Sequence, residues 1–217
     1  MKKKDIPLIL IAIASISFFV FAVVLLIKVS LTHVKTVTEI DKEAKYSVIE
    51  NDITTAYNAA SKSCVAIYST ANNKTALGSG VIYKQVDDTF YVVTNYHVIE
   101  GFADVNIYYD GIYEDAYVVG GVKNSDIAIL TFTFSNNHNK QKDKVLVCDF
   151  LNYETYKIPQ IGETTLIIGS PLAIENYNTL TRGVVSLTNE FEIITDAAIN
   201  NGNSGGGMFN IKGELIS

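Results

Sequence analysis

Short runs of β-branched and aromatic residues, separated by clusters of Gly, Asn and Asp, fill the chain from residue 64 onward. This pattern is typical of barrels and sandwiches. It predicts six strands before the polar loop 134–144, at Cys64–Thr70, Gly80–Lys84, Phe90–Thr94, Val105–Tyr109, Ala116–Val119 and Ile127–Phe132. Six more are expected after it, at Val145–Cys148, Thr164–Gly169, Leu180–Leu187, Glu192–Thr195, Gly206–Asn210 and Glu214–Ser217. We therefore expect an all-β body of two six-stranded barrels, over residues 62–134 and 145–217.

The residues before these strands follow other patterns. Residues 6–27 are apolar apart from one proline and two serines, and three lysines precede them. A helix of this length spans a bilayer, and the lysines place its amino terminus in the cytoplasm. We expect residues 1–28 to be a tail and an uncleaved transmembrane anchor rather than a cleaved signal peptide, with an extracytoplasmic body beyond it. Residues 29–51 have the composition of a linker, and apolar residues spaced three and four apart around 49–60 predict a short helix packed on the body.

Charge limits the classes of partner. The chain carries a net charge of −6, and the residues beyond Lys28 hold 13 basic against 22 acidic side chains, which is about −9. A body this acidic, without a basic stripe, is a poor match for a polyanion, so we expect no nucleic-acid partner. Nothing in the sequence indicates a cofactor or a metal site. The two cysteines, Cys64 and Cys148, lie in apolar runs typical of buried residues, and the sequence leaves open whether they form a disulfide.

Three polar residues at strand edges are candidates for nucleophilic catalysis. Residues 202–206 read GNSGG, and glycines around Ser204 allow a tight turn that points the N–H groups of Gly202 and Ser204 into one concavity, as an oxyanion hole requires. His97 follows an apolar run, whereas His33 and His138 lie in polar segments and are expected to be solvated. Asp126 precedes a run expected to be a buried strand. Taken singly, each has an ordinary structural interpretation: a β-turn, a core histidine and a turn aspartate.

Together, the motifs TNYH, SDIAIL and GNSGG place His, Asp and Ser in one order along an all-β chain. This order resembles that of chymotrypsin-like proteases and differs from that of subtilisin and the α/β-hydrolases. More closely, residues 94–98, 126–130 and 200–206 resemble the HtrA (Deg) family, with similarity extending from about Tyr57 to the last residue. The resemblance implies a trypsin-like serine protease domain over residues 52–217.

The resemblance also implies roles for individual residues. Ser204 would be the nucleophile, His97 the general acid and base, and Asp126 the group that orients His97. Gly202 and Ser204 would form the oxyanion hole. Ala198, Ile199 and Asn200 would form one wall of the specificity pocket, which carries no charge and so favours apolar side chains. Polypeptides would be the substrates and a homotrimer the assembly, by analogy.

Some features depart from the family. Asn201 and Gly207 stand where relatives often have proline, and Asn203 stands where digestive relatives carry an aspartate that pairs with a newly cut amino terminus. We therefore do not expect activation by cleavage. The PDZ module of the family is absent from these 217 residues, and the second barrel looks truncated after Ser217, so we expect the 217 residues to fold poorly and to be nearly inactive. The competing functional hypothesis is a catalytically silent relative that acts as a binding module or holdase at the membrane surface.

Overall fold

The computed structural model describes residues 23–29, 52–71, 74–148 and 158–217. Two compact units divide the chain, residues 1–51 and 52–217. In the first unit, residues 23–29 are helical. Among the described residues, no helix is both long and apolar enough to span a membrane. Most of the predicted anchor, residues 6–22, and nearly all of the linker lie outside the described residues.

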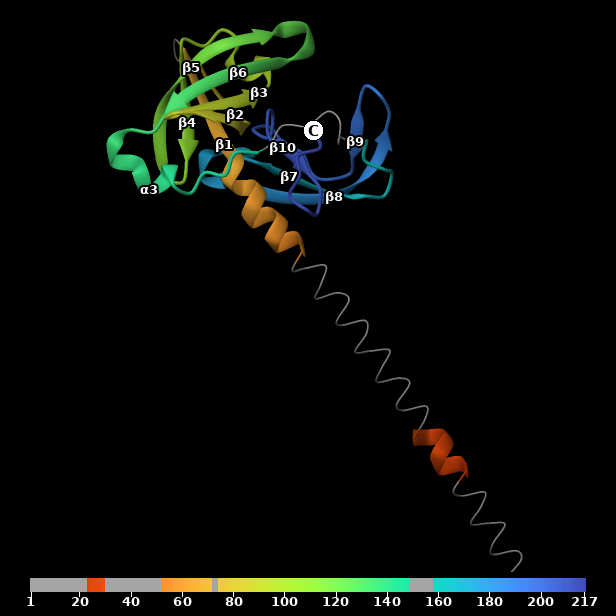
Figure 1. Ribbon diagram of the computed structural model, residues 1–217. Coiled ribbons are helices and arrows are strands. Elements are labelled where there is room, and N and C mark those ends of the chain that lie inside the picture. The colour runs from red at the N-terminus through yellow and green to blue at the C-terminus, as the bar shows by residue number, and fades with distance from the viewer. Residues whose placement is uncertain (1–22, 30–51, 72–73, 149–157) are drawn as a thin grey trace, which may run out of the picture. The chain divides into compact units, whose positions relative to one another are not determined.

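Strands β1 to β6 form a closed barrel in the second unit, with the order β1-β2-β3-β6-β5-β4 (Figure 1). All neighbouring strands are antiparallel. The strands are β1 (Cys64–Ala71), β2 (Lys74–Val86), β3 (Thr89–Thr94), β4 (Asp104–Tyr109), β5 (Ile112–Val122) and β6 (Ile127–Thr133). This confirms the prediction of a first six-stranded barrel, although β2 and β5 extend well beyond their predicted bounds.

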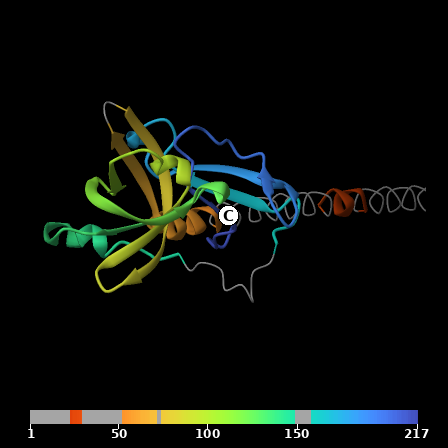
Figure 2. The same ribbon diagram turned by 90° about the horizontal axis from the view of Figure 1, so that it is seen from above.

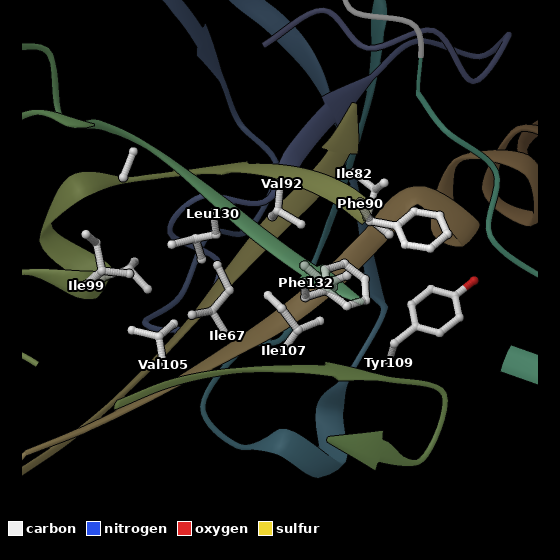
Figure 3. Packing of buried hydrophobic residues seen from close by; sticks show 13 residues of the cluster. Ile67, Ile82, Phe90, Val92, Ile99, Val105, Ile107, Tyr109, Leu130 and Phe132 are labelled. Atoms are coloured by element: carbon white, nitrogen blue, oxygen red, sulfur yellow. The ribbon is translucent and has the colours of Figure 1, made fainter. Parts of the chain in front are cut away.

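Alternation of buried and outward-facing residues explains why these segments close into a barrel. On β3, Phe90 and Val92 are fully buried while the alternate residues are half-buried, and β6 repeats this pattern with Leu130 and Phe132. Figure 3 shows these side chains converging inside the barrel together with Ile67 and Ile107. Because the side-chain period of a strand is two, a slip of one residue would turn this entire set toward solvent.

The second half of the body is an open sheet of four strands, in the order β10-β7-β8-β9. The strands are β7 (Thr164–Gly169), β8 (Thr179–Thr188), β9 (Ile193–Thr195) and β10 (Gly207–Phe209). The prediction of six strands was therefore too many for this part. The predicted strand at 145–148 has no strand conformation, although Cys148 N donates a backbone hydrogen bond to Ile82 O of the barrel at 2.9 Å. The predicted strand at 214–217 is reduced to a single bridge between Phe209 and Leu215.

The barrel and the sheet pack side by side through a second buried cluster (Figure 2). Residues 52–60 are helical, as the apolar spacing predicted, and bury Ala56 and Ala60 in this cluster. The other buried members come from β1, β2, β7, β10 and the last residues: Cys64, Val81, Leu166, Ile168, Phe209 and Leu215. Cys64 and Cys148 are not joined by a disulfide, and burial raises the pKa of the Cys64 thiol, so this thiol is an inert packing group. The cluster fixes the sheet against the barrel, along the line where the polar motifs meet.

Candidate active site

His97 is held at the barrel edge by a single helical turn, α2 (Tyr96–Ile99), which begins directly after β3. Val98 and Ile99 are buried in the barrel core and anchor the turn. Gly78 makes this packing possible, because a Cβ at this position would lie 2.4 Å from a Val98 methyl carbon. The His97 side chain points the other way and is 54% exposed. The histidine is therefore fixed in position by its neighbours and open to a substrate.

Asp126 binds both the backbone and the ring of His97. It follows the short 3₁₀ turn η2 (Lys123–Ser125) and adopts a left-handed conformation, with φ 50° and ψ 42°, directly before β6. One carboxylate oxygen, Oδ1, accepts the His97 N–H at 2.9 Å, and the other, Oδ2, lies 2.7 Å from His97 Nδ1. The Asp126 carbonyl accepts further bonds from Tyr96 N and Asn95 Nδ2. These contacts fix the orientation of the imidazole.

The protonation of this pair follows from its contacts. Desolvation raises the pKa of Asp126, but the hydrogen bonds from the His97 backbone and ring together outweigh it, so the pKa lies below its ordinary value. An ionised carboxylate can only accept, so Nδ1 must carry a proton. In the neutral imidazole, Nε2 is then an acceptor, which is the state that a general base requires.

Residues 202–206, which we call the elbow, are seated against the residues that lead into α2. Gly205 has φ +80°, and a Cβ on it would lie 2.3 Å from Thr94 Oγ1 and 3.0 Å from Asn95 N. Only glycine allows the backbone to approach this closely. The elbow therefore brings Ser204 to the edge of the barrel from which His97 projects.

Two backbone donors in the elbow are available to a ligand. Among the hydrogen bonds formed by the described residues, none has the Gly202 N–H or the Ser204 N–H as donor, although Gly202 is buried. Unpaired buried N–H groups are rare in folded proteins. The Asn201 carbonyl accepts a hydrogen bond from Leu172 N at 2.7 Å, and in a trans peptide the N–H points opposite to the C=O. Gly202 N–H is thus turned away from Leu172, and this arrangement suits an oxyanion.

The serine and the histidine are not yet joined. Within the described part of the chain, Ser204 Oγ forms no hydrogen bond with the His97 ring. Hydrogen bonds between catalytic groups are often long in the absence of substrate and shorten when it binds. The structure thus brings together His97 and Asp126 directly, and Ser204 only through the contact of the elbow with Thr94 and Asn95.

A cavity of about 300 Å³ opens beside the elbow. Residues from β2, β3, β6 and the last residues line it together with two glycines of the elbow: Val81, Val93, Thr94, Asn95, Ile127, Gly205, Gly206, Leu215 and Ser217. The predicted pocket wall at Ala198, Ile199 and Asn200 is not among them. Ile199 is 60% exposed, the Ala198 carbonyl accepts from Thr181 Oγ1, and the Asn200 carbonyl accepts from Asn203 N.

His138 differs from the sequence-based expectation. We predicted a solvated loop histidine, but its side chain is only 25% exposed and its Nδ1 lies 2.7 Å from Glu114 Oε1. The Ser135 N–H and hydroxyl also donate to the Glu114 carboxylate, at 2.8 and 2.7 Å. Glu114 was not predicted from the sequence, because it stands next to a second acidic residue, Asp115, in a strand without regular alternation. Ser79 was not predicted either; it is a polar residue between two glycines that is completely buried at the elbow. No group of three or more metal-ligating side chains occurs among the described residues.

Comparison with known proteins yields one family and a consistent set of relatives. Residues 78–217 match the family model described as "Trypsin-like peptidase domain". The chain is 37% identical to "Serine protease HtrA-like" of Staphylococcus haemolyticus over 67% of this chain and 24% of that protein. It is 33% identical to "Serine protease Do-like HtrA" of Bacillus subtilis over 68% of this chain and 34% of that protein. The chain thus spans between about a quarter and a third of these curated relatives.

A solved structure shows the same architecture. The crystal structure of the serine endoprotease from Yersinia pestis is 32% identical and superimposes with a TM-score of 0.62, covering 75% of this chain and 55% of that one.

Proposed function

The chain belongs to the trypsin-like peptidase family, and on that basis we propose that it is a serine endopeptidase that cleaves exported or misfolded polypeptides. The His97, Asp126 and Ser204 side chains form its triad. The names of the HtrA-type relatives support the class of reaction. The observation that carries the proposal is the exposed His97–Asp126 pair, with its 2.7 Å contact, on the same barrel edge as the elbow.

The mechanism follows from the protonation state of this pair. As substrate binds, His97 Nε2 takes the proton of Ser204 Oγ, which attacks the carbonyl carbon of the scissile bond. The imidazolium is stabilised by the Asp126 carboxylate, and the negative charge on the substrate oxygen is stabilised by the N–H groups of Gly202 and Ser204. His97 then protonates the leaving amine, and an acyl-enzyme forms. In the second half of the reaction, His97 takes a proton from a water molecule that attacks the acyl carbon, and then returns this proton to Ser204 Oγ as the acid product leaves.

Exposure distinguishes this pair from the other histidine–carboxylate pair among the described residues. The Glu114–His138 pair also has a 2.7 Å contact, but its carboxylate and imidazole side chains are only 8% and 25% exposed. The side chains of His97 and Asp126 are 54% and 44% exposed. A base must reach the proton that it abstracts, and His97 is the more accessible of the two histidines.

Replacement of the nucleophile tests the proposal. Ser204→Ala should reduce hydrolysis of a fluorescently labelled unfolded protein to background, because loss of a triad serine costs about 10⁶ in rate. Ser125→Ala is the matched control, since it removes an exposed hydroxyl next to Asp126 and should leave the rate unchanged. Turnover by the Ser204→Ala protein would disprove the assignment.

The second candidate is a catalytically silent module that binds polypeptides. The missing hydrogen bond between Ser204 and His97 favours it. The two candidates differ in one measurable property, because a silent relative would bind an unfolded protein as tightly as an active one but would not form a covalent adduct at Ser204.

The location and assembly of the protein are further parts of the proposal. Residues 6–27 anchor the chain in the cell membrane, with its amino terminus in the cytoplasm, and the body acts outside. The support is the apolar run itself and the three lysines before it. Protease added to intact spheroplasts should release the body by cutting near residues 34–45, and digestion only after lysis would contradict the orientation.

The homotrimer rests on family analogy alone and is tested by sedimentation equilibrium.

A further inference from the structure

Ser79 on β2 is completely buried where the barrel meets the elbow, and each of its polar groups has a partner. Its N–H donates to the Ser204 carbonyl at 2.8 Å, and its hydroxyl donates to the Gly202 carbonyl at 2.7 Å. The same hydroxyl oxygen accepts the Ser170 N–H at 2.9 Å, and the Ser79 carbonyl accepts from Thr94 Oγ1 at 2.7 Å. One residue of the first barrel therefore binds the backbone of the elbow at two places.

These bonds fix the peptide groups around the two free donors. A peptide unit is planar, so a hydrogen bond to its carbonyl also sets the direction of the next N–H. Ser79 holds the peptide groups 202–203 and 204–205 through their carbonyl oxygens. The peptide group 203–204, which carries the Ser204 N–H, lies between these two, and its carbonyl oxygen accepts from Gly206 N at 2.8 Å.

Gly202 is the point at which the elbow can most easily rearrange. It has φ +99°, and a glycine backbone rotates with little steric resistance. Leu172 N holds the peptide group before Gly202 through the Asn201 carbonyl. The peptide group after Gly202 is held by the Ser79 hydroxyl and by the hydrogen bond from Asn203 N to Asn200 O at 3.0 Å. Without the hydroxyl, the Gly202 carbonyl and the Ser170 N–H would be buried and unpaired, and rotation of the backbone would be their route to new partners.

We propose that Ser79 is a positioning residue that keeps the N–H groups of Gly202 and Ser204 aimed at the substrate oxygen. It does not touch the substrate itself, and it acts through the elbow. The inference rests on the proposed peptidase function for its effect on rate, but the restraint on the elbow is a property of the fold alone.

The test compares Ser79→Ala with Ser69→Ala. Ser69 is the matched control because its hydroxyl is also completely buried in the first barrel but has no hydrogen-bond partner among the described residues. Removal of one oxyanion-hole donor lowers kcat by about 10²- to 10³-fold, so misalignment of both donors by Ser79→Ala should lower kcat by about 10- to 100-fold. KM for a fluorogenic peptide should stay within about twofold, because the groups that bind the ground state are retained.

A peptide boronate, which places an oxygen in the oxyanion hole, should lose affinity in parallel with kcat in Ser79→Ala and keep its affinity in Ser69→Ala. A merely structural role would lower the amount of active enzyme without changing the boronate affinity of the remainder. Unchanged kcat and boronate affinity in Ser79→Ala would overturn the proposal. If Ser79→Ala does not fold, Ser79→Cys, which keeps a similar shape with a weaker donor, should show an intermediate loss of kcat, and wild-type kcat would overturn the proposal.

A second readout separates this inference from the proposed function. Amide hydrogen exchange at Asn203 and Gly206 should accelerate at least tenfold in Ser79→Ala and stay unchanged in Ser69→Ala, whether or not the protein is an active peptidase. A wild-type protein that hydrolyses nothing would refute the peptidase function, and exchange alone would then decide whether Ser79 holds the elbow. Unchanged exchange would show that it does not.

Discussion

Substitution of Asp126 by asparagine is the sharpest test of how the carboxylate acts on His97. The two oxygens of Asp126 have separate tasks, since Oδ1 accepts the His97 backbone N–H and Oδ2 accepts from the ring. Asn has nearly the same shape but one oxygen and one NH₂ group. If the oxygen keeps the backbone bond, the NH₂ group faces His97 Nδ1, which must then accept. The ring proton moves to Nε2, and the imidazole can no longer take a proton from Ser204.

The expected loss is large in rate and small in stability. The wrong tautomer lowers kcat by about 10⁴-fold, which corresponds to about 5.5 kcal/mol of transition-state stabilisation. The fold should lose no more than about 1 kcal/mol, because one hydrogen bond of the ring is weakened while the bond to the backbone remains. Both side chains are about half exposed, so their contact adds little to the stability of the folded state.

The assay measures kcat and KM with a fluorogenic peptide, together with urea unfolding of the same samples. Asp88→Asn is the matched control, because it makes the same chemical change in a carboxylate that forms an ion pair with Lys142 at the surface. It should retain wild-type kcat. A kcat for Asp126→Asn within tenfold of the wild-type value would refute the role assigned to the carboxylate, whereas a loss of kcat accompanied by unfolding would refute the claim that its role is specific to the ring.

Two further predictions concern stability. Desolvation raises the pKa of Glu114, but hydrogen bonds from His138 and Ser135 together outweigh it, so the pKa is lower in the folded protein than in the unfolded chain and the stabilisation is present above the unfolded pKa. Glu114→Gln should therefore lower the free energy of unfolding by about 2 kcal/mol at pH 7, and this difference should shrink as the pH falls through the lowered pKa of Glu114; urea melts at a series of pH values below 7 check this, and a difference that does not shrink with falling pH would contradict it. Asn203 is buried, and its Oδ1 has no partner among the described residues, so Asn203→Asp would bury an unpaired charge and should lower Tm by about 5–10 °C in a thermal melt; an unchanged Tm would be the contrary result.

The first barrel was predictable because its strands follow the two-residue period closely. Phe90, Val92, Leu130 and Phe132 all lie where alternation places them, and the apolar spacing of residues 49–60 likewise predicted the helix found at 52–60. The second half was less regular. The apolar run at 145–148 lacks alternation, and it packs Val145 and Val147 on the barrel cluster without joining a sheet, which a count of apolar residues does not distinguish from a strand.

The polar contacts that the sequence did not predict join distant residues. Glu114 and His138 are 24 positions apart, and Ser79 and Gly202 are 123 positions apart. No local pattern reports such a pairing. The motifs around His97, Asp126 and Ser204 could be found because their order along the chain matches that of a known family, although each residue alone has an ordinary structural interpretation. The restraints on them come from serines and backbone groups whose roles depend on the packing of the sheet against the barrel.

The most direct measurement of the central claim is covalent labelling with a fluorescent fluorophosphonate, which reacts with an activated serine and not with an inert one. The wild-type chain should gain one adduct, and peptide mass mapping should place it on Ser204. Ser204→Ala should remain unlabelled, and His97→Ala should be labelled more slowly by several orders of magnitude, because the base is lost. A folded wild-type chain that gains no adduct, or an adduct that persists in Ser204→Ala, would contradict the assignment of this chain as a serine endopeptidase.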